Sequence, residues 1–252
     1  MLENIQVKTL SSTQNPQKLV AQAMHNDYSE KFIMDEPFWM DLDETKAGGM
    51  VVEKCLKYGH FGPVEHPVLI LAFKLIPHSV MQQLRTHRAG ITFDVQSMRY
   101  TSKRFVDWYN RHKGDILSEE SIQDYEDLFY LRQPGIYQDR FGNSVDFNYE
   151  MRLCQIEDQI EIFAENVSFY LIKNKMPFEM FRDLIPAGYR QNMVVTANAR
   201  SWMHILDMRL PKNAQLEINY VMELVLQRCL EWMPEVFQYY VEKRKGKNKL
   251  AP

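Results

Sequence analysis

Residues 83–100 read Gln-Leu-Arg-Thr-His-Arg-Ala-Gly-Ile-Thr-Phe-Asp-Val-Gln-Ser-Met-Arg-Tyr. The residues that lead into this stretch predict a helix over 77–88, because Pro77 suits a first-turn position and apolar side chains then recur on one face. Gly90 ends that helix. The polar residues after it therefore begin where backbone groups and side chains can turn towards a ligand.

Arginines, amides and hydroxyls dominate this stretch. Its candidates for ligand contact are Gln83, Arg85, His87, Arg88, Ser97 and Arg99. A planar guanidinium forms bidentate hydrogen bonds with phosphate, and several together suit a dianion. The plain alternative is a solvated basic face at a helix end. Such faces are usually Lys and Glu, whereas only Lys103 lies near this stretch, so the mixture favours a binding site.

The same stretch resembles the signature of the flavin-dependent thymidylate synthases, usually Arg-His-Arg, seven residues, Ser, then x-Arg-Tyr. Two departures from that form are visible. Thr86 stands where the first arginine of the triplet would be, and the gap from Arg88 to Ser97 is one residue longer than the common form. The Thr-His-Arg variant is identified as a subtype of the signature. The sequence leaves open whether Arg85 takes the place of the missing arginine.

Composition limits the class of protein. At 252 residues the chain is long enough for one substantial core, and its formal net charge of −3 argues against a general nucleic-acid binder. The longest apolar run, residues 68–73, is too short to span a bilayer, and no charged-then-apolar leader opens the chain. Three widely spaced cysteines without paired motifs are typical of a reducing cytosol. The sequence therefore predicts a cytoplasmic protein with no membrane partner.

A turn-rich loop, Tyr-Gly-His-Phe-Gly-Pro-Val-Glu-His-Pro at 58–67, precedes an apolar run over 68–76 that predicts a strand covered on both faces. His60, Glu65 and His66 lack the i, i+4 helical spacing of a zincin, and no cysteine pair accompanies them, so no metal site is predicted. The family typically has Gly-His-x-x-Pro-x-Glu-His at this point, which the loop matches. By resemblance the loop binds the flavin.

A second motif, Asn-Ala-Arg-Ser at 198–201, follows a predicted buried strand over 193–197 and opens a helix. The family carries the same motif, with an Asn or His six residues on and an Arg five beyond that. His204 and Arg209 match these two positions. The family also places a phosphate-binding arginine sixteen residues before the motif, where this chain has Arg182.

The resemblance implies a role for each of these residues. Arg209 and Ser97 are expected to be catalytic, Arg209 by stabilising the deprotonated pyrimidine and Ser97 by holding the nucleotide rather than attacking it. By resemblance, deoxyuridine monophosphate (dUMP) is bound by Gln83, Arg85, Ser97, Arg99, Arg182 and Arg209. The flavin, FAD, is lined by His60, Glu65, His87, Arg88, Asn198, Arg200 and His204.

The reaction implied by the resemblance is reductive methylation of dUMP to thymidylate (dTMP). Methylenetetrahydrofolate supplies the carbon and NADPH the reducing equivalents, as co-substrates beside FAD. Conventional thymidylate synthases, which are unrelated, attack uracil with a cysteine, and no cysteine here has an adjacent base to lower its pKa. No G-x-G-x-x-G or P-loop is present, so the flavin would not sit in a Rossmann domain. The family forms homotetramers whose active sites are shared between subunits.

The predicted fold is α+β, with a small mixed or antiparallel sheet packed against long helices, as in flavin-dependent thymidylate synthases. We expect a single catalytic domain over residues 1–240, with a subtype insertion at 112–147 and a basic disordered tail at 241–252. Apolar residues recur every three or four positions from about 147 to 173 and predict a long amphipathic helix with Cys154 on its buried side.

Two other classes of function stay open. One is a relative that uses flavin and folate to methylate uridine within RNA. The other is a non-enzymatic RNA-binding module built on residues 99–111, where aromatic and basic side chains interleave as in proteins that stack bases of single strands. Rings packed inside an edge element are the plain alternative for that segment, and the acidic net charge favours it. We therefore expect no nucleic-acid partner.

Overall fold

The structure is a computed structural model that describes residues 2–139, 141–211 and 213–247. Its contacts divide the chain into two compact units. The first comprises the described parts of Met1–Ile5, Lys74–Met81 and Val95–Asn192, and the second those of Gln6–Phe73, Gln82–Asp94 and Met193–Pro252. Each unit consists of three separate segments of the chain, and boundaries between the units fall inside β-strands. The single catalytic domain expected over 1–240 stays a prediction.

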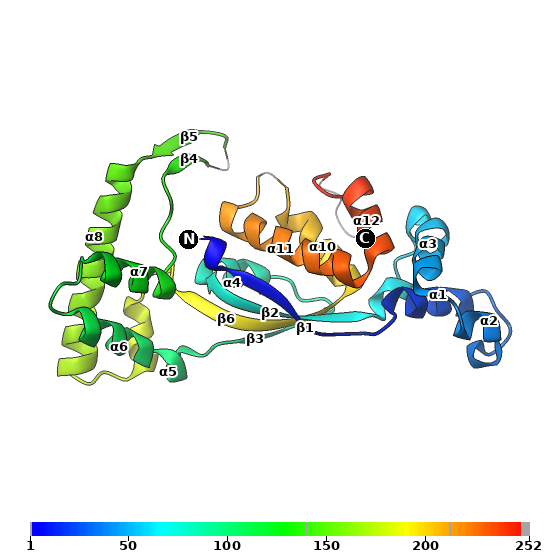
Figure 1. Cartoon of the computed structure of the whole chain (residues 1–252), viewed down its shortest axis with the longest axis horizontal. Helices are drawn as coiled ribbons and strands as arrows, with labels where there is room; N and C mark the ends of the chain where they lie inside the picture. The colour runs from blue at the N-terminus through cyan, green and yellow to red at the C-terminus, as the bar shows by residue number, and fades with distance from the viewer. Residues whose placement is uncertain (1, 140, 212, 248–252) are drawn as a thin grey trace. The chain divides into compact units, whose positions relative to one another are not determined.

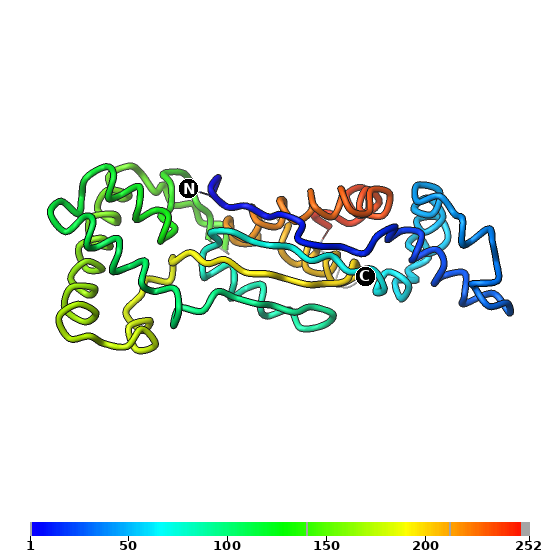
Figure 2. The backbone as a smooth tube through the Cα atoms, turned by 60° about the horizontal axis from the view of Figure 1, so that its bottom comes forward, coloured from blue at the N-terminus to red at the C-terminus, as the bar shows by residue number. Residues whose placement is uncertain are grey.

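Four strands form the main sheet. They are β1 (Gln6–Ser12), β2 (Val68–Pro77), β6 (Arg190–Asn198) and β3 (Ile91–Val95), paired in that order and visible side by side in Figure 2. Backbone hydrogen bonds from Ala199 N to Pro67 O (3.1 Å) and from His78 N to Tyr189 O (2.9 Å) lie at opposite ends of β2 and β6, which therefore run antiparallel. The predicted small antiparallel sheet packed with long helices is confirmed.

The second unit contains most of the long helices (Figure 1). They are α1 (Pro16–Asn26), α3 (Glu44–Lys54), α10 (Ala199–Arg209), α11 (Leu216–Trp232) and α12 (Pro234–Lys243). The unit also contains the short helix α2 (Pro37–Met40) and 3₁₀ turns at Ile33–Asp35, Leu56–Tyr58 and Pro63–Glu65. The fully buried Trp202 donates its indole N–H to Leu69 O (3.3 Å) and so ties α10 to β2. None of the described helices is both long and apolar enough to cross a membrane.

A buried glutamine joins three of these helices. Gln17, on α1, donates its side-chain amide to Glu44 O on α3 (3.3 Å) and to Glu235 Oε2 on α12 (2.6 Å). Its carbonyl oxygen accepts hydrogen bonds from the backbone N–H groups of Glu235 (3.1 Å) and Val236 (3.2 Å). A Cβ at Gly48 of α3 would lie 2.6 Å from the Gln17 amide nitrogen, so only glycine permits this approach.

The first unit has an aromatic core. Its helices and strands are α5 (Met98–Thr101), α6 (Lys103–His112), α7 (Glu119–Leu128), the hairpin β4 (Gly135–Gln138) and β5 (Ser144–Phe147), α8 (Tyr149–Asn166), a π-helix over Val167–Lys173, α9 (Phe178–Phe181) and a 3₁₀ turn over Arg182–Leu184. Tyr125 and Phe129 stack at 4.6 Å between ring centroids and both contact Phe163. The predicted insertion at 112–147 therefore supplies core residues to this unit.

Cys154 lies on the exposed side of α8, not on the buried side that we expected. The buried stripe of α8 comprises Ile156, Ile160 and Phe163. Cys154 precedes Ile156 by two positions, about 200° around a helix of 3.6 residues per turn, and therefore faces away from the stripe. The long helix itself is confirmed as α8 followed by the π-helix.

The described part of the predicted disordered tail is ordered. α12 continues to Lys243, and the next residue, Arg244, is buried and forms an ion pair with Asp207 of α10. The guanidinium of Arg244 also lies 5.5 Å from the ring centroid of Phe61, in the 58–67 loop. The buried ion pair between Arg244 and Asp207 holds this segment in place. The basic composition of the tail gave no sign of this pairing. Residues 248–252 of the tail lie outside the described part of the chain.

Candidate functional site

The signature stretch begins at the end of α4 (His78–Leu84), which is shorter than the helix expected over 77–88. The Thr86 hydroxyl donates to Gln83 O (2.8 Å), and the His87 N–H bonds to Leu84 O (3.1 Å), a tighter closure than an α-helical turn. The helix therefore ends before the arginines, and Arg85, Thr86 and Arg88 are exposed.

Gly90 brings the signature stretch against the start of α10. Its φ is +64°, and a Cβ there would collide with the Ser201 hydroxyl and the Asn198 amide. Two hydrogen bonds hold the contact, from Ser201 Oγ to Ala89 O (2.8 Å) and from Asn198 N to Gly90 O (3.3 Å). The Asn198 side chain also caps α10 by accepting from Ser201 N (2.8 Å). The first part of the signature stretch, residues 83–94, thus lies beside the Asn-Ala-Arg-Ser motif in the second unit.

The guanidinium of Arg209, in the last turn of α10, reaches back to the signature stretch. Its Nε donates to His87 Nε2 (3.2 Å), and its Nη2 donates to Gln83 O (3.1 Å) and to Thr86 Oγ1 (3.0 Å). His204 lies five positions before Arg209, and its ring meets the His87 ring edge to face at 5.5 Å between centroids. The structure therefore brings together Gln83, His87, His204 and Arg209.

His87 is held neutral in this cluster. It is buried, and burial together with the nearby Arg209 cation and His204 lowers the pKa of its imidazole from 6.5 to about 4. Arg209 Nε can only donate, so His87 Nε2 must accept, which leaves the imidazole proton on Nδ1. Burial also lowers the pKa of Arg209, which stays charged. The pair therefore offers an N–H of a neutral ring beside a fixed cation.

A second contact joins α10 to the 58–67 loop. Glu65 Oε1 accepts from Arg200 Nη1 at 2.6 Å, in an ion pair whose side chains are 50% and 39% exposed. Ala199 N also bonds to Pro67 O (3.1 Å), so the loop is anchored at the first residue of α10. The predicted flavin residues Glu65, Asn198 and Arg200 are therefore adjacent.

His60, from the same loop, has a different neighbour. Its Nε2 lies 3.5 Å from Asp27 Oδ2, at the end of α1, and its backbone carbonyl accepts from the Cys55 thiol. The described contacts of His60 thus involve Asp27 and Cys55 rather than Glu65. Within residues 2–139, 141–211 and 213–247, no group of three His, Cys, Asp or Glu side chains could hold a metal ion.

Three predicted nucleotide residues belong to the first unit. Ser97 precedes α5 and is exposed, and Arg99 is exposed within α5 with its guanidinium 5.8 Å from the Tyr100 ring centroid. α5 packs against α9, and Arg182 follows α9 directly and is exposed. The fold therefore places a hydroxyl and two cations on neighbouring elements of this unit.

The cysteines are unsuited to nucleophilic attack. Burial raises the pKa of the Cys55 thiol to about 11 and that of Cys229 well above its ordinary value. Cys154 is exposed, but it forms no described hydrogen bond with a base. In the described chain, no basic side chain accepts a hydrogen bond from the Ser97 hydroxyl either.

Two aromatic rings of the segment at 99–111 pack inward, whereas Tyr100 is exposed. Phe105 and Trp108 of α6 are fully buried, and the Trp108 indole donates to Ser121 O (3.2 Å). Stacked bases need an exposed ring face, which these two side chains lack. Phe105 and Trp108 therefore follow the packing alternative for this segment.

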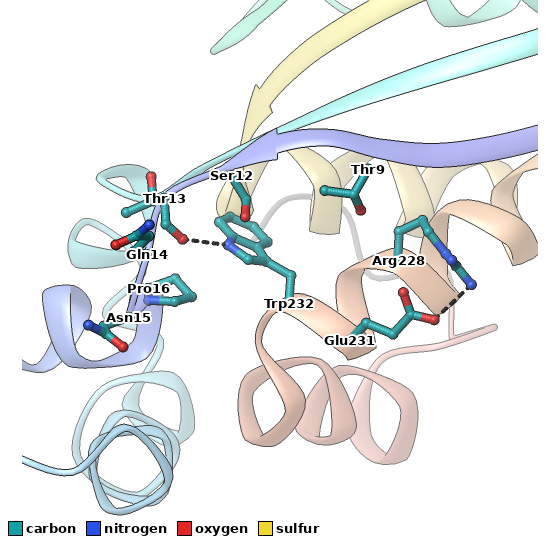
Figure 3. Close-up of a pocket in the computed structure, with 9 residues that line it drawn as sticks. All are labelled: Thr9, Ser12, Thr13, Gln14, Asn15, Pro16, Arg228, Glu231 and Trp232. Atoms are coloured by element: carbon teal, nitrogen blue, oxygen red, sulfur yellow. Dashed lines mark hydrogen bonds and ion pairs between the residues drawn. The ribbon is translucent and has the colours of Figure 1, made fainter.

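A hollow of about 420 Å³ lies elsewhere in the second unit, between β1 and the end of α11 (Figure 3). Its lining residues are Thr9, Ser12, Thr13, Gln14, Asn15, Pro16, Arg228, Glu231 and Trp232. The guanidinium of Arg228 is paired with Glu231 (2.8 Å), and the Trp232 indole donates to Thr13 O (3.1 Å). The hollow contains none of the predicted site residues, so we do not place the active site there.

Two contributors to the candidate site were not among the predicted residues. Thr86 was noted only as a departure from the family signature, yet it bonds Arg209. Gln215 accepts a hydrogen bond from the Gln83 side chain at 2.5 Å. Each contact joins residues more than one hundred positions apart, so hydrophobic periodicity carried no signal for either contact.

Comparison with known proteins identifies relatives along nearly the whole chain. Residues 8–235 match the family model described as "Thymidylate synthase complementing protein". A protein of Haloarcula marismortui named flavin-dependent thymidylate synthase is 34% identical over 254 residues, an alignment covering 98% of this chain and 99% of the relative. Both matches extend over residues of both compact units.

Solved structures share the fold. Thymidylate Synthase X (ThyX) from Helicobacter pylori, solved with FAD and dUMP, superposes with a TM-score of 0.70 at 15% identity, covering 93% of this chain and 97% of that one. The UMP/dUMP methylase PolB from Streptomyces cacaoi, bound with 5-Br UMP, gives a TM-score of 0.68 at 16% identity and covers 99% and 97%. The fold predicted from the sequence is that of these proteins.

Proposed function

The chain belongs to the thymidylate synthase complementing protein family, and from that premise we infer that it is a flavin-dependent thymidylate synthase. It methylates dUMP reductively to dTMP, with FAD as cofactor and with methylenetetrahydrofolate and NADPH as co-substrates. The observation in the structure that carries this function is the contact between Arg209 and His87, which joins two motifs more than one hundred residues apart.

The donor set beside the start of α10 fits FAD. A helix N-terminus and the guanidinium groups of Arg88 and Arg200 suit a diphosphate, and the exposed Glu65 carboxylate suits ribose hydroxyls. We assign the flavin to His60, Glu65, His87, Arg88, Asn198, Arg200 and His204. When bound, FAD supplies redox chemistry that no side chain can provide.

We assign the nucleotide to Gln83, Arg85, Ser97, Arg99, Arg182 and Arg209. Arg99 and Arg182 are exposed cations suited to its phosphate, and Ser97 supplies a hydrogen bond. Gln83 and Arg209 hold the pyrimidine, and the exposed Arg85 is the remaining candidate.

Arg209 is the proposed catalytic group. Its fixed positive charge stabilises the anion that forms when the pyrimidine loses its ring proton, and burial strengthens that interaction. Ser97 keeps the nucleotide oriented without attacking it. Cys55 and Cys229 stay protonated because burial raises the pKa of each thiol, so covalent attack by either on the uracil ring is disfavoured.

We also propose that the protein forms a homotetramer with active sites shared between subunits, and that it works in the cytoplasm. The dispersal of nucleotide residues over two compact units supports the first proposal. The cysteine composition supports the second.

The visible spectrum of the purified protein tests the function most directly. We expect a flavin absorbance band that bleaches with NADPH and recovers when dUMP and methylenetetrahydrofolate are added, with dTMP as product. The same assay with UMP and with transfer RNA separates the nucleotide enzyme from the RNA-methylating alternative. A colourless protein that makes no dTMP contradicts the assignment.

A further inference from the structure

Thr86 occupies the centre of a closed set of hydrogen bonds. Its hydroxyl donates to Gln83 O (2.8 Å) and accepts from Arg209 Nη2 (3.0 Å), and the same Nη2 donates to Gln83 O (3.1 Å). Arg209 Nε is engaged by His87. Two of the three guanidinium nitrogens are therefore fixed by three acceptors at the end of α4.

The remaining nitrogen, Nη1 of Arg209, takes part in none of the hydrogen bonds found among the described residues. A guanidinium is planar, so fixing Nε and Nη2 also fixes the direction of Nη1. Arg209 is only half-buried, which leaves this amino group reachable by a ligand acceptor. The contacts with Thr86 and His87 thus select which end of Arg209 meets the ligand.

The acceptor at position 86 adds to Gln83 O in holding Nη2. The common signature has an arginine there, and an arginine offers donors alone. It would also place a second positive charge beside Arg209, where like charges repel. A hydroxyl removes that charge and supplies the acceptor, and threonine is stiff about χ1, so the acceptor stays in place.

We propose that Thr86 is a positioning residue that aims Arg209 at the pyrimidine. This inference rests on the proposed function and deepens it, because Thr86 acts on the substrate only through Arg209. Capping of α4 by the Thr86 hydroxyl is the simpler role, and it predicts an effect on stability alone. The experiment must therefore separate catalysis from stability.

The full-length, flavin-loaded protein is compared with Thr86→Val, which keeps the shape without the acceptor, and with Thr86→Ser, which keeps the acceptor. Thr86 is exposed, so both variants should fold, and Thr86→Ala serves as a second hydroxyl-free variant. Flavin absorbance, melting temperature, kcat and KM for dUMP are measured for each. We expect Thr86→Val and Thr86→Ala to lower kcat/KM for dUMP about tenfold, the size of one lost hydrogen bond to a charged group. Flavin content should stay near that of the wild type, and Thr86→Ser should stay within about twofold.

A double-mutant cycle distinguishes positioning of Arg209 from a purely structural role of Thr86. If Thr86 acts through Arg209, Thr86→Val should cost little further activity in an Arg209→Lys background, because the guanidinium it aims is gone. Additive losses overturn the proposal, as do wild-type kinetics in both hydroxyl-free variants or equal defects in Thr86→Ser and Thr86→Val. A wild-type protein that neither binds flavin nor makes dTMP would instead overturn the proposed function.

Discussion

At the scale of single residues, the neighbours of His87 set its chemistry. Burial, Arg209 and His204 lower the pKa of its imidazole to about 4, against 6.5 for the free side chain. Between these two pH values the unfolded chain takes up a proton that the folded chain excludes. Protonation therefore favours unfolding over this range, whereas above pH 6.5 both states are neutral at this residue.

We predict that the free energy of unfolding falls as the pH is lowered from about 6.5 to 4, by up to about 1.4 kcal/mol per pH unit from His87. His87→Gln should lose this part of the dependence. Urea unfolding at about pH 4.5 and 5.5, with a reference above the titration range at about pH 7.5, measures it.

The exposed His66 supplies the control for this prediction. His66→Gln, the same chemical change at an exposed position, is measured alongside His87→Gln. A His87→Gln variant with the wild-type slope would show that the imidazole titrates normally in the folded protein.

At the scale of elements, the contact between α1 and α3 depends on the absence of one side chain. A Cβ at Gly48 would lie within 2.7 Å of three atoms of the Gln17 side chain, whereas nothing lies within 4 Å of one at Gly49. Gly48→Ala should therefore lower the free energy of unfolding by about 1–3 kcal/mol through overpacking. Gly49→Ala should raise it by about 0.5–1 kcal/mol, because alanine is the better helix former. Thermal unfolding of the two variants checks both signs, and equal effects would contradict the packing argument.

The segment after α12 makes a second prediction at this scale. Arg244 pairs with Asp207, whose side chain is 1% exposed, and burial raises the pKa of that carboxyl. Arg244→Met leaves the carboxyl buried without its cation, so we expect a loss of about 3–5 kcal/mol in the free energy of unfolding. Flavin content should fall as well, since Arg244 also contacts Phe61 in the loop that carries Glu65.

The matched control replaces Lys243, the exposed residue that precedes Arg244. Lys243→Met should leave both stability and flavin content near those of the wild type. Full stability in Arg244→Met, or in a chain shortened after Tyr240, would restore the disordered tail that the basic sequence suggested.

How far the sequence predicted the structure depended on the range of the interactions. The segment 68–76, apolar at nearly every position, predicted β2, and the motifs at 83–100 and 198–201 pointed to segments that do meet. The end of α4 was misplaced because the Thr86 hydroxyl captures a helix carbonyl. The order of the tail was missed because the partner of Arg244 lies 37 positions away. Hydrophobic periodicity reports which face of a strand or helix is buried. It carries no information about individual hydrogen bonds and ion pairs, such as those of Thr86 and Arg244.

At the scale of the whole molecule, the proposed nucleotide residues divide between the two units, with Arg182 in the first and Arg209 in the second. Arg182→Ala and Arg209→Ala should each abolish most activity, because each removes a charge that faces the nucleotide. If active sites are shared between subunits, mixed tetramers of these two variants should regain activity, since some sites then contain both arginines.

Refolding the two variants together, and each one alone, measures this complementation by dTMP formation. The separately refolded variants control for recovery during the procedure. A mixture that remains as inactive as its components would mean that each site is built from one chain.

Trp108 and Trp202 are both fully buried, and they lie in different units. The two remaining tryptophans, Trp39 and Trp232, belong to the same unit as Trp202. In Trp108→Phe, all indole fluorescence would then come from one unit, and its difference from the wild-type emission would report the other. A single conservative change thus provides an optical means to learn whether the two units melt together.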